Sequence, residues 1–160
     1  MSLLTNDLAS LRRELDASDS ATAVLQARCE ALRLPGGPRV LAQVEAAEAA
    51  ADPEVRRQLK AGPDEVLACR RVRLVWGEIV LSRAVNWYRP SRLTADMRRR
   101  LAGTAEPFGV VARPLDYRRV RLETRLVDSA GAPAVLHCRA MLVTPDGEPL
   151  ALVEETYTGA

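Results

Sequence analysis

Histidine and cysteine are scarce in this chain of 160 residues, which contains one histidine and three cysteines. Cys29, Cys69 and Cys138 lie far apart and form no Cys-x-x-Cys pair. Zinc sites of the usual kind need more soft ligands than this, so we expect no metal site and three small, buried cysteines. A nucleophile pair of Cys138 and His137 is also disfavoured, because adjacent residues of a strand point to opposite faces.

The chain also lacks a strong charge of one sign and any long apolar run. Its 23 basic and 21 acidic residues leave a net charge of +2, which disfavours a broad nucleic-acid-binding surface. No apolar stretch approaches the length of a membrane span, and residues 1–7 have neither the basic region nor the apolar run of a signal peptide. We therefore expect a cytoplasmic protein with no membrane span and no nucleic-acid partner.

The remaining composition, 48% apolar and 28% charged, fits one globular domain covering residues 1–160. Helices are expected in its first third, where apolar residues recur at helical spacing. The expected elements there are a helix through Leu8, Leu11 and Leu15, a helix over Ala21–Leu34, a strand over Pro38–Glu45 and a short helix opening at Asp52-Pro53-Glu54.

Strands dominate after Glu65. Alternating apolar residues and turn-rich connections predict Val66–Val75, Ile79–Tyr88, Tyr117–Val127, Ala134–Thr144 and Leu150–Tyr157. A helix carrying Leu93, Met97 and Leu101 separates the hairpins. This order predicts an α+β fold, in which a large antiparallel β-sheet has helices packed on one face.

Two of these strands place one charged residue on an otherwise apolar face. Arg70 alternates with apolar residues of the strand 66–75, and Glu154 with those of the strand 150–157. Burying either charge is unfavourable unless an opposite charge meets it. Either the two residues neutralise each other, or a small anionic ligand completes the arrangement. Arg83 lies in a similar pattern and would add positive potential to an interior face.

Glu154 has an acidic neighbour, Glu155, and both faces of their strand are apolar, so alternation leaves open which carboxylate points inward. A glutamate in an apolar pocket would have a raised pKa and could transfer a proton near neutral pH. On an edge strand the same charge would only discourage aggregation. The strand 117–127 alternates cleanly, and its charged face, which begins with Arg119, is expected to meet solvent.

The order of these pieces resembles the chorismate pyruvate-lyase family, small single domains that remove pyruvate from chorismate and leave 4-hydroxybenzoate. The correspondence extends from Asp19 to Tyr157. Its motifs are Asp19-Ser20-Ala21-Thr22 opening a helix, Arg70 early in a strand, Arg83 with Pro90 after the hairpin, Pro107-Phe108-Gly109 where the family has Pro-Leu-Gly, and Pro149-Leu150-Ala151-Leu152-Val153-Glu154 where an apolar strand ends in the functional glutamate.

The resemblance implies a buried ligand pocket closed by helical flaps over the sheet. Arg70 would bind a substrate carboxylate, and Glu154 would lie at the other end of the ring as the second catalytic residue. Phe108, Gly109 and Ala21 would line the pocket, and Arg83 would also take part in binding the substrate. Two positions depart from the family, because Phe108 replaces a leucine and Ala21 replaces a larger, methionine-like residue.

The implied activity is that of a carbon–oxygen lyase. Because aromatisation drives the reaction, such an enzyme needs no metal, cofactor or covalent nucleophile, only orientation of both carboxylates and one proton-transfer group. Its partner would be chorismate or a related aromatic-precursor carboxylate, and the protein would be a monomer or a homodimer.

Two alternatives stay open. UTRA-type effector domains of helix-turn-helix repressors share the implied fold and bind small ligands without catalysis, so a noncatalytic module for an aromatic carboxylate is the first. The second is an interaction protein in which Arg70 pairs with a structural acid and no cavity exists. An enzyme needs Arg70 and Glu154 on one enclosed pocket, whereas a sensor needs the pocket and tolerates the loss of Glu154.

Overall fold

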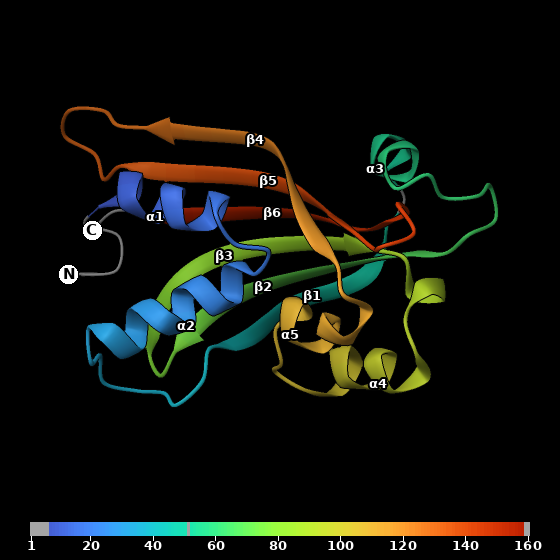
Figure 1. The fold of residues 1–160 in the computed structure, drawn as a ribbon, viewed down its shortest axis with the longest axis horizontal. Helices are drawn as coiled ribbons and strands as arrows, with labels where there is room; N and C mark the ends of the chain where they lie inside the picture. The colour runs from blue at the N-terminus through green and yellow to red at the C-terminus, as the bar shows by residue number, and fades with distance from the viewer. Residues whose placement is uncertain (1–6, 51, 159–160) are drawn as a thin grey trace.

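Six strands form one antiparallel sheet in the computed structural model, which describes residues 7–50 and 52–158 (Figure 1). The strands are β1 (Leu41–Ala50), β2 (Leu67–Trp76), β3 (Ile79–Tyr88), β4 (Arg118–Val127), β5 (Val135–Val143) and β6 (Pro149–Thr158). Their order across the sheet is β1-β2-β3-β6-β5-β4, which confirms the α+β class. Residues 1–6, on which the expectation about a signal peptide depends, lie outside the described residues.

Two three-stranded halves meet at the pairing of β3 with β6. This central ladder joins Arg83–Tyr88 to Ala151–Thr156 through six residue pairs. Each of the other four ladders has nine. The middle of the sheet is therefore its shortest seam.

Four helices cover one face of the sheet (Figure 1). They are α1 (Leu8–Asp16), α2 (Ala21–Ala31), α4 (Ala95–Gly103) and the short α5 (Phe108–Val111). Three of them begin with a side-chain cap, since Asp7, Ser20 and Thr94 accept hydrogen bonds from backbone N–H groups of the first turn. Leu8, Leu11 and Leu15 of α1 are buried against the sheet, as their spacing predicts.

The opposite face carries α3 (Pro53–Gln58), whose Val55 packs with Leu67, Met141 and Leu152 of the sheet. This helix adds a small second layer to the predicted one-sided packing. The three cysteines are buried and unpaired, as expected. Within the described ranges, no helix has the length and apolar character needed to cross a membrane, and no cluster of metal-ligating side chains is found.

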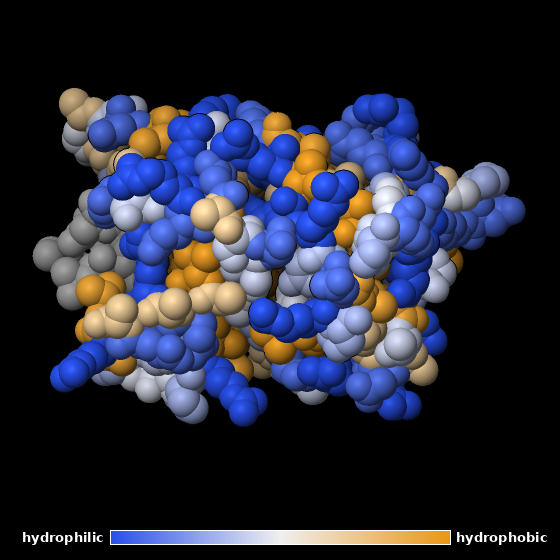
Figure 2. Space-filling view, in the orientation of Figure 1, coloured by the Kyte–Doolittle hydropathy of each residue, from blue (hydrophilic) through white to orange (hydrophobic). Residues whose placement is uncertain are grey.

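Both edge strands differ from their predicted patterns. β1 extends to Ala50 with a bulge between Val44 and Ala46, and Val44 is exposed although its cross-strand partner Val72 is buried. In β4 a register shift between Arg121 and Glu123 leaves Leu122 and Leu126 exposed. The helix-covered face is mostly hydrophilic at its surface, with apolar side chains visible between the polar ones (Figure 2).

Candidate functional site

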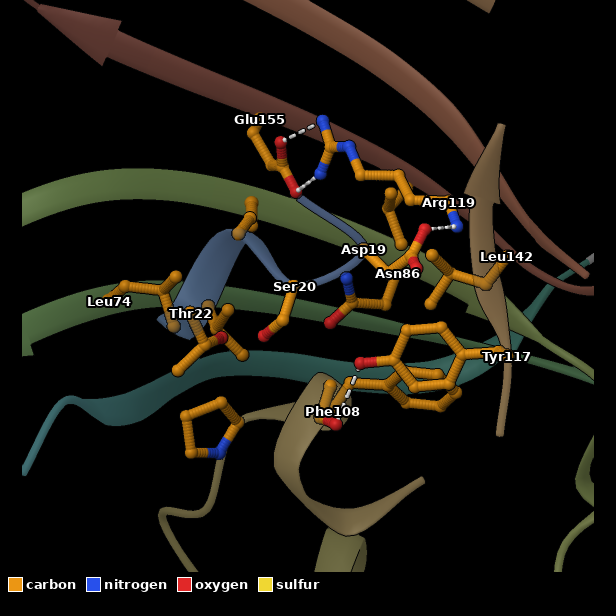
Figure 3. A pocket seen from close by; sticks show the side chains of 16 residues that line it. Asp19, Ser20, Thr22, Leu74, Asn86, Phe108, Tyr117, Arg119, Leu142 and Glu155 are labelled. Carbon is orange, nitrogen blue, oxygen red and sulfur yellow. Dashed lines mark hydrogen bonds and ion pairs between the residues drawn. The ribbon is translucent and has the colours of Figure 1, made fainter. Parts of the chain in front are cut away.

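A small pocket that opens to solvent lies between the sheet and the helices α2 and α5 (Figure 3). It crosses the β3–β6 seam, because both central strands contribute to its lining. The lining residues are Asp19, Ser20, Ala21 and Thr22 at the start of α2, Pro107, Phe108 and Gly109 at α5, and Val72, Leu74, Ala84, Asn86, Tyr117, Arg119, Leu142, Val153 and Glu155 from the sheet and its approach.

The α5 wall is anchored to the sheet through the backbone that precedes it. The Arg70 guanidinium donates hydrogen bonds to the carbonyl oxygens of Thr104 and Glu106 at 3.2 and 2.9 Å. The backbone N–H of Ala42 donates to the carbonyl of Ala105 at 2.7 Å. Three consecutive carbonyls are thus held by β1 and β2, which fixes where Phe108 begins its helix.

Tyr117 closes the same wall from the other side. Its hydroxyl donates to the Gly109 carbonyl at 2.8 Å, and burial raises the pKa of this phenol. A side chain at position 109 would not fit, because a Cβ there would lie 2.9 Å from the Tyr117 hydroxyl oxygen. The glycine of the Pro107-Phe108-Gly109 turn is therefore required by close packing.

A buried ion pair forms the polar wall of the pocket (Figure 3). Arg119 donates from both terminal nitrogens to the two carboxylate oxygens of Glu155, at 2.9 and 2.8 Å, and the two side chains are only 7% and 8% exposed. Burial alone would lower the pKa of Arg119, but the charge and hydrogen bonds of Glu155 hold it above its ordinary value. Tyr157 also donates to Glu155, at 3.3 Å. This pair leaves neither partner's charge uncompensated.

The start of α2 forms the opposite rim. Ser20 accepts the backbone N–H of Ala23 at 3.1 Å as the helix cap. The preceding carboxylate, Asp19, accepts the backbone N–H of Arg119 at 3.0 Å. This long-range bond joins the α1–α2 connection to β4, so the rim of the pocket is attached to the outer half of the sheet.

Asn86 lies on the floor at the centre of the sheet. Its side chain is buried, and its amide points into the space between Ser20 and the Tyr117 ring (Figure 3). Among the described residues, the amide has no hydrogen-bond partner. The amide nitrogen and oxygen keep contact with the open space of the pocket, so this group is available to a bound molecule.

Arg70 is buried as its alternation predicts, but its predicted role as a carboxylate ligand is not supported by its position. The guanidinium is directed to backbone carbonyls and does not line the pocket. Burial lowers the pKa of Arg70. The residue therefore positions the α5 wall from behind.

The family resemblance implied Glu154 as the pocket glutamate, and this is wrong, because β6 presents the other carboxylate of the doublet to the helices. Glu154 lies on the opposite face and pairs with Arg139 at 3.3 Å, whereas Glu155 lines the pocket. Arg83 was also placed on the wrong face. It is exposed and pairs with Glu45 at 3.0 Å, away from the pocket.

Ala21, Phe108 and Gly109 are found on the pocket lining, where the family resemblance implied them. Sequence reasoning missed Asn86 and Arg119. Arg119 was hidden by a regular charged alternation that predicts solvent exposure. A signal for Asn86 existed in the small and polar residues Ser82, Ala84 and Asn86, which share one face of a strand in the middle of the sheet.

Several solved structures of regulator proteins have a fold similar to that of this chain. The effector domain of PhnF from Mycobacterium smegmatis superimposes with a TM-score of 0.60 at 13% identity, covering 84% of this chain and 87% of that one. The ligand-binding domain of a putative GntR-family transcriptional regulator from Bordetella bronchiseptica gives 0.57 at 16%, covering 76% and 83%. The possible transcriptional regulator YydK from Bacillus subtilis gives 0.54 at 14%, covering 74% of this chain but only 57% of that one. At these identities the likeness concerns the fold alone.

No protein-family model matches the chain. A close relative in sequence is the uncharacterized protein y4mC of Sinorhizobium fredii, which is 36% identical over 173 aligned residues. The alignment covers 94% of this chain and 73% of the relative. The chain therefore belongs to the same protein family as y4mC and has the fold of regulator effector domains.

Proposed function

We propose that this protein is a small-molecule-binding domain whose ligand occupies the pocket between α2, α5 and the sheet. The observation that carries the proposal is Asn86, a buried amide without a protein partner on the floor of that pocket. Ligand sites combine an apolar lining with a few polar groups that fix orientation, and this pocket has that composition. The structural neighbours described as effector or ligand-binding domains support the same function.

Blocking the pocket tests the proposal. Ala21→Leu adds a bulky side chain at the first position of α2, on the pocket lining. The matched control is Ala23→Leu, an exposed position of the same helix that does not line the pocket. We expect ligand-observed NMR with a fragment panel to detect binders that Ala23→Leu retains and Ala21→Leu loses. Equal binding to both variants, or no binder at all, would contradict the proposed site.

A chorismate lyase is the second candidate, and Glu155 favours it. This carboxylate lies on the pocket wall, where it could exchange a proton with a bound substrate. Its bidentate contact with Arg119 weighs against such a role, since both carboxylate oxygens already accept hydrogen bonds. Incubation with chorismate followed by chromatography decides between the candidates, because only the lyase releases 4-hydroxybenzoate and pyruvate.

A further inference from the structure

We propose that the pocket selects an uncharged ligand that presents a hydrogen-bond donor and acceptor side by side, as a carboxamide does, and that Asn86 recognises these two groups. This inference rests on the proposed binding function and deepens it by naming the ligand class. It makes Asn86 the residue that determines specificity.

The donors and the acceptor of the Asn86 side chain indicate which functional group a ligand needs in order to bind it. Its side chain is 7% exposed, and none of its amide hydrogen bonds is made within the described residues. The amide offers two N–H donors and one carbonyl acceptor. A ligand carboxamide would accept from the Asn86 Nδ2 and donate to its Oδ1, which satisfies both ends of the buried group with one functional group.

The charges around the pocket favour an uncharged ligand. Among the described lining residues, Arg119 is the sole basic side chain, and Glu155 engages both of its terminal nitrogens. The remaining charged group on the lining is the carboxylate of Asp19. An anion entering the pocket would find no uncommitted cation there, and a desolvated charge without a partner is unfavourable.

Two cations lie close to the pocket but outside its lining. Arg113 shares an adjoining hollow with Asp19, Ser20 and Tyr117, and Arg70 lies behind the α5 wall. Arg70 is the cross-strand partner of Asn86, but its guanidinium is held by the carbonyls of Thr104 and Glu106. Its field therefore reaches the pocket without a direct contact. Such a field favours the oxygen end of a neutral amide and attracts a full negative charge too, but without direct contact it does not offset the desolvation of that charge.

The rest of the lining fits an apolar body attached to the amide. Val72, Leu74, Ala84 and Val153 cover the floor, and Phe108 forms the facing wall. The Phe108 ring is itself held by Tyr88, with ring centroids 5.1 Å apart. A single aromatic ring bearing a carboxamide combines these features.

Three isosteric probes test the inference, namely benzamide, benzoate and benzamidine, which carry charges of 0, −1 and +1. We expect the unmodified protein to bind benzamide about tenfold more tightly than either charged probe, as measured by NMR titration. Asn86→Leu should weaken benzamide binding about tenfold. Asn86→Asp should reverse the order and favour benzamidine, because a carboxylate matches an amidinium bidentately.

A control variant separates recognition from general effects on the sheet. Ser82→Ala removes another buried polar group from the same face of β3, outside this pocket, and should leave benzamide affinity unchanged. Thermal melts establish that each variant is folded. Loss of probe binding in Ala21→Leu would show that the probes bind in this pocket.

Two outcomes would overturn the inference while leaving the binding function intact. One is tighter binding of benzoate than of benzamide, and the other is equal benzamide affinity in the unmodified protein and Asn86→Leu. If none of the three probes binds at millimolar concentration, the inference also fails. The fragment panel with Ala21→Leu then decides separately whether the pocket binds any small molecule.

Discussion

Arg119 and Glu155, which are 36 positions apart in the sequence, form a bidentate ion pair on the wall of the pocket. The neighbouring carboxylate, Glu154, points to the other face of β6 and forms a looser, half-exposed pair with Arg139. Two adjacent glutamates of one strand therefore have different environments. This contrast provides the first of four predictions.

Glu155→Gln should lower the free energy of unfolding by about 3 kcal/mol, because it leaves the buried Arg119 without its counter-charge. Glu154→Gln should cost less than about 1 kcal/mol, as is usual for exposed pairs. Urea denaturation of both variants measures the difference. Equal effects would mean that the two carboxylates have equivalent surroundings, contrary to the structure.

Arg70→Met should lower the free energy of unfolding by about 2 kcal/mol, since the carbonyls of Thr104 and Glu106 lose their charged donor. It should also weaken ligand binding without touching the ligand, because the α5 wall loses its anchor. Arg71→Met is the matched control, as Arg71 is exposed and its pair with Glu48 spans 4.0 Å. A fully stable Arg70→Met with unchanged binding would remove Arg70 from the support of the pocket.

Gly109→Ala should destabilise the protein by about 1–2 kcal/mol, because the new methyl group meets the Tyr117 hydroxyl. Gly103→Ala is the control, since a Cβ there meets nothing within 4 Å. In a Tyr117→Phe background the obstructing oxygen is gone, and the cost of Gly109→Ala should shrink. Calorimetry of the four variants measures this coupling, and strictly additive effects would contradict the proposed clash.

The change in the free energy of unfolding at acidic pH should depend on Glu65. Hydrogen bonds from Arg89 lower the pKa of this carboxyl from 4.5 to about 2, and a further bond from Ser91 contributes. A lowered folded-state pKa stabilises the protein above pH 4.5, and this contribution is lost as the pH falls from 4.5 to 2.

Glu65→Gln should therefore cost about 2 kcal/mol at pH 7, after allowance for solvent screening, and almost nothing at pH 2. Glu78→Gln is the control, because no ion pair of Glu78 is found among the described residues. Urea denaturation at a series of pH values measures both variants. A cost for Glu65→Gln that does not change with pH would exclude this linkage.

The strands and the main helices could be predicted because their signals are local. Leucine spacing in α1, the cap of α2 and the hairpin turns each depend on a few neighbouring residues. The orientation of β6 could not be predicted in this way, since apolar residues on both faces make the two directions of Glu154 and Glu155 equivalent until the partner strands are placed.

The role of Arg70 shows a second limit. Alternation predicts that its side chain is buried, and this is confirmed. Its partners are carbonyl groups 34 and 36 positions away, and any residue could supply a carbonyl. Backbone acceptors leave no signature in the sequence, so the guanidinium was assigned to a substrate carboxylate instead.

The pocket crosses the shortest ladder of the sheet, the pairing of β3 with β6, and this has a consequence for how a ligand affects the sheet. Asn86 belongs to one half of the sheet and Glu155 to the other, and only six residue pairs join the two halves between them. A molecule bound across this junction would contact both halves of the sheet and hold them together. The sheet with a bound ligand would therefore resist sliding of its two halves along the β3–β6 ladder better than the empty sheet does.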